Sequence, residues 1–221
     1  FRYAVWALQN TLKNATTAKL AGAVEGDAVT GADKGNLPYA GIPFPIPKNG
    51  YEVLWNQTAR FSAAVSHSVA LGYMVDTAGN PTTLPTIDGY YLHPWYDKKG
   101  KLRSQTFDAY FGFSATLTSP PSSAGIVFLN YYLPNAAESG QRVWFYTPGQ
   151  RRVRLAPEFA YDVPVASYAG VTVWDDIYGY VGRMDRFDFK LVGKKEMLVP
   201  YNNFGVTNTL PTKDFIGTKF I

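Results

Sequence analysis

The clearest pattern in the chain is a strict alternation of apolar and other residues between positions 106 and 118. Apolar side chains take the odd positions, which are Phe107, Ala109, Phe111, Phe113, Ala115 and Leu117. Successive side chains of a strand point to opposite faces, so this pattern predicts one long antiparallel strand from Thr106 to Thr118, with an apolar face and a solvent face. The Pro120-Pro121 pair closes it.

Other segments predict more strands of the same sheet, which would occupy mainly residues 63–200. Apolar residues share parity in 63–75, form a continuous run in 125–132 and alternate in 186–192, with 195–199 continuing the sheet. The uninterrupted run predicts a strand that is covered on both faces or lines a ligand. Strand 141–146 and a strand beginning at Arg152 predict a hairpin across a Pro-Gly turn, and residues 76–85 read as a polar turn region.

Two segments have helical spacing instead. Residues 3–21 keep apolar positions three or four apart and stop before a glycine. A second helix is predicted from Gly50 to Phe61, where Asn49 and Glu52 have the spacing of an N-terminal capping box. Residues 23–49 are rich in Gly and Pro, and the apolar residues between their prolines favour a strap laid across the body over a free linker.

The aromatic residues of the predicted strands need a cover. The candidates for an apolar ligand-binding face are Phe107, Phe111, Phe113, Phe145, Phe187 and Phe189. Because two helices are predicted, these rings either form a filled core or line an apolar pocket of the kind that holds an acyl chain. The sequence leaves both readings open.

The densest positive charge lies at Arg151, Arg152 and Arg154. On a strand, Arg152 and Arg154 share one face and Val153 and Leu155 the other. This pattern is typical of a solvated edge strand, and it also suits a patch that binds an anionic head group or an acidic partner.

Composition narrows the function classes. The chain has 221 residues, 16% of them aromatic, a net charge of +4, and no cysteine, which excludes disulfides, thiolate nucleophiles and cysteine metal sites. The charge is mild and mostly dispersed, so nucleic acid binding is not indicated. No apolar run reaches the length of a membrane span.

Catalytic chemistry finds little support. The chain has two histidines, His67 and His93, and both are expected at the surface rather than in a triad or a metal site. Asp175 and Asp176 are neighbours whose side chains diverge, and Asp185 and Asp188 lie close to basic residues. We therefore predict no catalytic residue, no metal ligand and no cofactor.

Three blocks carry a family resemblance. They are GIPFPIPKNGYEVLWN at 41–56, PGQRRVRLAPEFAYDVP at 148–164 and DRFDFKLVGKKEMLVPYNN at 185–203. In this order they resemble a proteobacterial family catalogued as domain of unknown function 1329 and described as similar to LolA and LolB, the outer-membrane lipoprotein-sorting proteins. The resemblance implies an α+β fold in which a curved antiparallel sheet, an open half-barrel, wraps around a few helices. It also implies a periplasmic protein peripheral to the outer membrane.

Three functional hypotheses follow. The first is a non-catalytic periplasmic protein that carries or receives a lipid, a lipoprotein acyl chain or another hydrophobic ligand. The second is a glycan-active enzyme or glycan-binding module, for which Trp95-Tyr96-Asp97 and Trp174-Asp175-Asp176 are the motifs. The third is a structural partner of an envelope protein.

The resemblance also suggests how the chain is organised. Residues 1–221 are expected to be a single domain or a large portion of one, because members of the family are longer. The last residues lack the alternation of a closing strand. We therefore expect an open sheet whose free edge is completed by further sequence, a second fragment or another copy.

Overall fold

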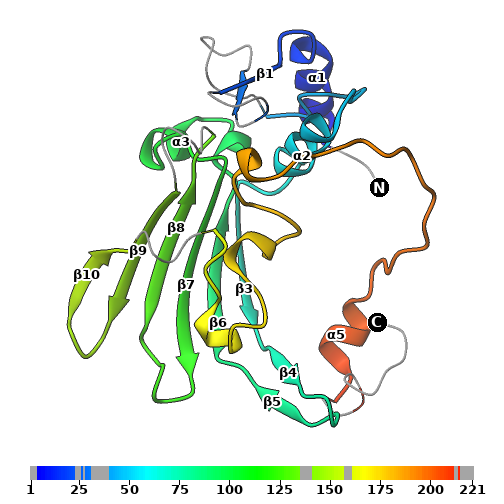
Figure 1. Cartoon of the computed structure of the whole chain (residues 1–221). Helices are drawn as coiled ribbons and strands as arrows, with labels where there is room; N and C mark the ends of the chain where they lie inside the picture. The colour runs from blue at the N-terminus through cyan, green and yellow to red at the C-terminus, as the bar shows by residue number, and fades with distance from the viewer. Residues whose placement is uncertain are drawn as a thin grey trace.

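The computed structural model describes residues 4–22, 26, 28–30, 40–134, 141–156, 161–211 and 214. Its centre is a six-stranded sheet in the order β10-β9-β8-β7-β6-β3, in which every neighbouring pair is antiparallel (Figure 1). The strands are β3 (Val65–Ala70), β6 (Thr86–Leu92), β7 (Phe111–Ser119), β8 (Val127–Tyr132), β9 (Gln141–Thr147) and β10 (Arg152–Leu155). This open, curved α+β sheet confirms the predicted fold class.

Shorter elements lie at the ends of the sheet. Two small hairpins are formed by β1 (Lys19–Ala21) with β2 (Ala28–Thr30), and by β4 (Tyr73–Val75) with β5 (Pro81–Thr83). The α-helices are α1 (Val5–Asn14), α2 (Gly50–Thr58), α3 (Lys101–Gln105) and α5 (Phe204–Thr209). Short 3-10 helices are η1 (Pro94–Tyr96), η2 (Ala166–Tyr168), η3 (Trp174–Asp176) and η4 (Met184–Arg186).

The register divides the sheet into an inner and an outer face. We call inner the face that carries Phe111, Phe113, Ala115 and Leu117 of β7, all of which are buried. The register places Phe113 beside Tyr91 of β6 and Asn130 of β8 on this face. The outer face carries Ser114 and Thr116 of β7 and the alternate residues of β8 and β9. The predicted alternation is thus confirmed for this part of β7.

The inner face is covered by the chain itself. The segment 161–189, yellow to orange in Figure 1, lies in front of β6 and β3. Its Trp174 packs edge-on against Phe128, with ring centroids 5.5 Å apart, and Tyr178 packs against Phe111 at 5.1 Å. Trp174 is buried, whereas Tyr178 remains partly exposed to solvent. Full burial of a large apolar side chain contributes about 1.5–3 kcal/mol to folding. Most of the inner face is therefore a filled core, and one small pocket remains beside β6.

Helix α2 closes one end of this core. Its N-cap is Asn49, whose side-chain oxygen accepts the Glu52 N–H at 2.9 Å, as the sequence predicts. The Glu52 carboxylate accepts the Lys48 N–H at 2.5 Å, one residue earlier than in a standard capping box. The helix ends at Thr58 rather than at Phe61, and its Trp55 packs against Tyr110 with centroids 6.0 Å apart.

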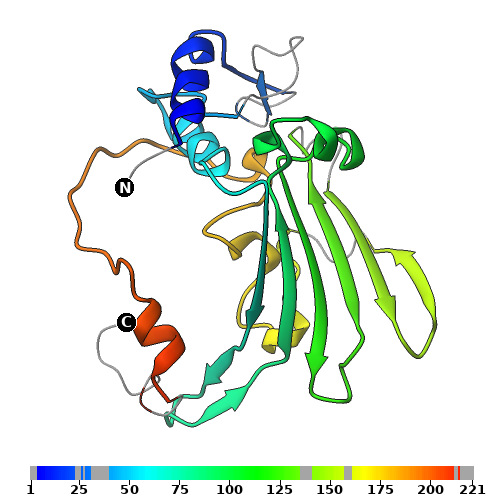
Figure 2. The same ribbon diagram turned by 180° about the vertical axis from the view of Figure 1, so that it is seen from behind.

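The structure moves the start of one predicted strand and shows that two others do not form. The strand predicted from Thr106 begins at Phe111, because Phe107 and Asp108 have the left-handed φ values 56° and 58°, which break the extended path. Residues 187–200, predicted to include strands, belong to no helix or strand. They run away from the sheet as the long orange arc in Figures 1 and 2, where they have no neighbouring strand to supply hydrogen bonds.

Other boundaries also differ. The first helix ends at Asn14, and the threonines that follow it lead into β1. Its predicted start at Tyr3 lies outside the described residues, and so does much of the predicted strap 23–49. The strand predicted at 63–75 is interrupted at residues 71–72 into β3 and β4, and the polar region 76–85 contains β5. Strand β6 was not predicted, because Asp88 and Gly89 interrupt its apolar pattern.

The edges of the sheet are β3 and β10. All six residues of β3 are exposed, and the strand carries no Lys, Glu or Pro that would discourage pairing with another chain. We therefore predict that residues 1–221, produced alone, associate through β3. Light scattering should give a mass above that of the monomer.

A Val69→Lys change should shift this chain toward the monomer, because an edge lysine opposes strand addition. Thr118→Lys adds the same charge on the central strand β7 and is the control. A monomer that neither change affects would contradict the prediction.

Candidate ligand-binding groove

The outer face holds an apolar groove of about 460 Å³. We call it the outer groove, and it is lined by Phe107, Ser114, Val127, Leu129, Tyr131, Trp144, Phe145, Tyr146 and Val153. Its volume lies within the range of about 300–1,000 Å³ that is typical of small-molecule sites. No coloured segment crosses the green strands in the view from behind (Figure 2). Within the part of the chain that the structure describes, no segment therefore covers this apolar surface.

Alternate residues of three neighbouring strands form its floor. Leu129 of β8 lies opposite Trp144 of β9, and Val127 lies opposite Tyr146, which in turn lies opposite Val153 of β10. The other residues of β8 point to the inner core. This explains the continuous apolar run 126–132, because β8 presents apolar side chains to both faces of the sheet.

Phe107 limits the groove at one end. Its left-handed backbone turns the ring onto the outer face, where it stacks on Trp144 with centroids 6.1 Å apart and an interplanar angle of 19°. This conformation costs a bulky residue about 1–3 kcal/mol and persists where surrounding bonds enforce it. Here the Asp108 N–H donates to the Arg103 carbonyl at 3.0 Å, and the Asp108 carbonyl accepts from Trp95 Nε1 at 3.3 Å.

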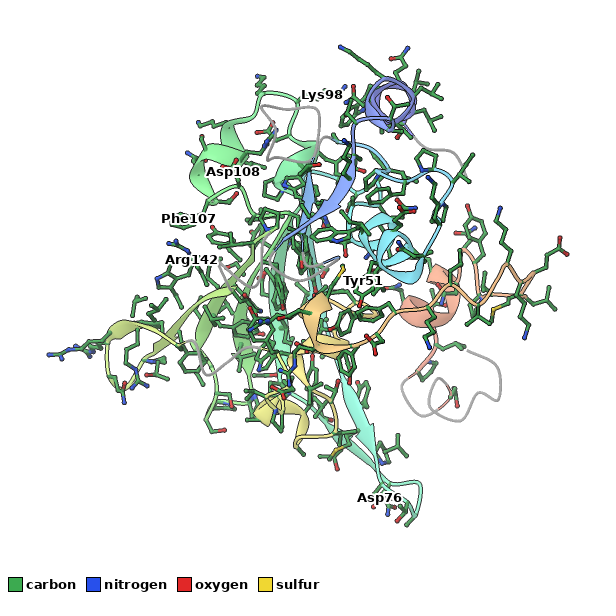
Figure 3. The ribbon with its side chains drawn as sticks, turned by 45° about the horizontal axis from the view of Figure 1, so that its top comes forward. Tyr51, Asp76, Lys98, Phe107, Asp108 and Arg142 are labelled. Carbon is green, nitrogen blue, oxygen red and sulfur yellow. The ribbon has the colours of Figure 1, made fainter. Side chains whose placement is uncertain are left out.

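A cation sits on this ring. The guanidinium carbon of Arg142 lies 4.2 Å from the centroid of Phe107, and Figure 3 shows the two side chains next to each other, away from the orange segment. Arg142 is exposed and lies opposite Tyr131, whose pKa is raised by burial. The outer groove thus combines an apolar floor with one positively charged end.

The six predicted ligand-face residues do not share one face. Phe111 and Phe113 are buried in the inner core, and Phe107 lies on the outer face because of its left-handed turn. Phe145 lies opposite Phe128 on the inner side of β9, although it also borders the outer groove. The remaining two belong to no strand: Phe189 packs on Tyr51 of α2 at 5.3 Å, and Phe187 packs on Phe189 at 6.0 Å.

The three arginines of the predicted anion-binding patch are exposed at the free edge of the sheet. Arg151 lies in the β9–β10 turn with φ 51°, and Arg154 lies opposite Phe145, on the inner side of β10. Two acidic residues follow the patch in sequence and could pair with it: Asp162 is bound by Arg186 at 2.7 Å, and Glu158 lies outside the described residues. The patch stays a prediction.

A second pocket lies on the inner side. It measures about 200 Å³, and its lining includes Arg60, Tyr91, His93, Phe111 and Tyr178. Burial, together with the nearby Arg60 charge, lowers the pKa of His93 to about 4, so its ring is neutral at physiological pH. The expectation of a surface position is therefore wrong for His93, which packs on Phe111 at 5.2 Å. The pocket is small for a lipid.

A third hollow, of about 640 Å³, lies beside α1 and the segment 44–52. Its lining includes Lys19, Lys48 and Glu52, so it is less suited to an apolar ligand than the outer groove. Among the residues that the structure describes, no group of His, Cys, Asp or Glu is arranged to hold a metal ion. Within the same residues no helix combines the length and hydropathy that a membrane crossing requires.

Comparison with known proteins identifies the family. The model of the family described as protein of unknown function, DUF1329, matches residues 2–221. The chain belongs to the DUF1329 family. It is also 34% identical to Uncharacterized protein PA3922 of Pseudomonas aeruginosa over 208 residues, a match that covers 90% of this chain and 42% of that protein. The chain thus spans less than half the length of this relative. No solved structure matches the chain.

The acidic residues of the DUF1329 chain have different environments. Asp175 is buried, which raises its pKa to about 6, while Asp185 is paired with Arg183, whose hydrogen bonds lower the pKa of that carboxyl. The space beside Asp175 is tight, since a Cβ at Gly182 would meet its carboxylate oxygen at 2.6 Å. Asp175 is therefore held within the cover of the inner face, and Asp176 is exposed.

Sequence reasoning missed the outer groove. Val143 to Tyr146 are all apolar, so both faces of this strand carry apolar side chains, and this signal of a second apolar face was visible in the sequence. No sequence signal indicated that Phe107 lies on the outer face. Its alternation with the residues that follow predicts the inner face, and a left-handed phenylalanine cannot be predicted from this pattern.

Asp175 generates a pH prediction. A carboxyl with a folded-state pKa of about 6 against an ordinary 3.8 binds its proton more tightly when folded, so stability falls as pH rises from about 4 to 6 and then levels off. Asp175→Asn should therefore raise the free energy of unfolding at pH 8 by up to about 3 kcal/mol and leave it nearly unchanged at pH 4. Urea unfolding at both pH values measures this, and lower stability of the variant at pH 8 would contradict it.

The arginine patch gives a second prediction. Replacing Arg152 and Arg154 together with Gln should weaken binding to an anionic membrane surface and flatten its salt dependence, with little change in melting temperature, because both side chains are exposed. Vesicle sedimentation with and without anionic lipid tests the binding. A marked fall in melting temperature would show instead that these arginines are internal ion-pair partners.

Proposed function

We propose that this chain is a non-catalytic binding protein for a hydrophobic ligand with an acyl chain, either a free amphiphile or a lipoprotein. The observation that carries the proposal is the outer groove, an apolar hollow of about 460 Å³ on a sheet whose other face is already filled. An apolar hollow of this size is the usual candidate for a small-molecule binding site. The groove, rather than the inner aromatic face, is the proposed site.

The shape of the groove supports an elongated ligand. Its floor follows β8 from Val127 to Tyr131, a rise of about 13 Å for a strand at about 3.3 Å per residue. An extended alkyl chain lying along the strand would contact Leu129 and Trp144 at the middle of this path. Burial of apolar area would supply the affinity, at about 25 cal/mol per Å² before the costs of binding.

The chemistry of the lining supports binding rather than catalysis. The groove is lined by apolar and aromatic residues and one serine, without a histidine or a carboxylate that could accept a proton. The resemblance to lipoprotein-sorting proteins supports a periplasmic location near the outer membrane and an envelope protein as partner. These assignments belong to the proposal together with the ligand.

Titration calorimetry with dodecanoate tests the proposal. The intact chain should bind it, and Leu129→Asp should weaken binding about tenfold or more, because a carboxylate in the middle of the floor must be desolvated by the alkyl chain. Leu198→Asp is the matched control, since Leu198 is fully exposed and lies outside the groove lining. The proposal fails if the intact chain binds no dodecanoate, or if both variants bind like the intact chain.

A further inference from the structure

Arg142 is placed to recognise the head of a ligand that lies in the outer groove. It stands on β9 directly opposite Tyr131 and two residues before Trp144, so its side chain starts from the groove end where Phe107 lies. Within the described residues, no hydrogen bond or ion pair of the Arg142 side chain is found. Its guanidinium carbon lies over the Phe107 ring, 4.2 Å from the centroid.

The contact with the Phe107 ring leaves the N–H groups of the guanidinium available for an anion. A guanidinium that lies over a ring uses its flat face, while its N–H groups point outward in the plane and can bind two oxygens of a carboxylate or phosphate at once. Such bidentate bonds to an anion are the stronger class of hydrogen bond. The ring also restricts the side chain, which reduces the entropy lost when an anion binds.

The nearest carboxylate in sequence to Phe107 is engaged elsewhere. Asp108 Oδ1 lies 3.7 Å from Arg103 Nε, and its backbone is held by the Arg103 carbonyl and the Trp95 indole. The same left-handed turn that aims Phe107 at Arg142 therefore ties Asp108 to helix α3. Asp108 is therefore bound to Arg103 and does not occupy the Arg142 guanidinium.

We propose that the outer groove binds an anionic amphiphile, with its alkyl chain on the floor formed by β8 and β9 and its carboxylate or phosphate on Arg142. This inference rests on the proposed function and narrows its ligand. The acyl chains of a lipoprotein are joined through uncharged ester and amide groups, so they offer Arg142 no anion. A free fatty acid or a single-chain alkyl phosphate offers both parts.

The test compares three probes with the same alkyl chain: dodecanoate, dodecyl phosphate and dodecanol. Calorimetry on the intact chain should show dodecanoate or dodecyl phosphate binding about tenfold more tightly than dodecanol. Added salt should weaken binding of the anionic probes and leave dodecanol nearly unaffected. Whichever anion binds more tightly identifies the head group.

Variants locate the effect. Arg142→Gln should remove the preference for the anionic probes and leave dodecanol affinity unchanged, while Arg142→Lys, which keeps the charge without the fork, should retain part of the preference. Lys195→Gln removes an exposed cation that lies outside both the outer groove and the arginine patch, and it should change nothing. Unchanged dodecanol binding also shows that Arg142→Gln has not disturbed the groove.

The outcomes separate the two proposals. If dodecanol binds as tightly as both anionic probes, or if Arg142→Gln retains the full preference, the assignment of Arg142 is overturned while the apolar groove remains a binding site. If none of the three probes binds, the proposed function fails and this inference fails with it.

Discussion

Both faces of strand β8 carry apolar side chains, and the chain covers one of them. Phe128 and Tyr132 pack into the inner core beneath the segment 161–189, while Val127, Leu129 and Tyr131 form the floor of the outer groove. Each apolar face of a sheet must pack against another element, and the described chain supplies such an element for one of the two faces. The groove lies on the outer face because the side chains of the protein itself already occupy most of the inner face.

The backbone at Phe107 and Asp108 gives the groove its polarity. Without the left-handed turn, the alternation of β7 would continue and Phe107 would join Phe111 and Phe113 on the inner face. The turn instead places the ring against Trp144 and under Arg142. Hydrogen bonds from helix α3 and Trp95 hold the strained residues, so the α3 region positions the groove end although none of its residues lines it.

Local patterns predicted the parts of the fold that depend on neighbours in sequence. The Asn49 cap, the alternation from Phe111 to Leu117 and the β9–β10 hairpin are such features. The alternating stretch 186–192 forms no strand, because pairing requires a free edge that no local pattern can reveal. The groove depends on strand order and on a left-handed phenylalanine, and both are set by tertiary contacts.

The central claim is that the inner face is a filled core and the outer face binds the ligand. A crystal structure of the chain with 12-bromododecanoate tests it most directly, because the anomalous signal of bromine locates the alkyl end without ambiguity. The account predicts bromine on the outer face, over the β8 and β9 side chains that include Leu129 and Trp144. Bromine in the inner pocket that Tyr91 and Tyr178 line would contradict this claim.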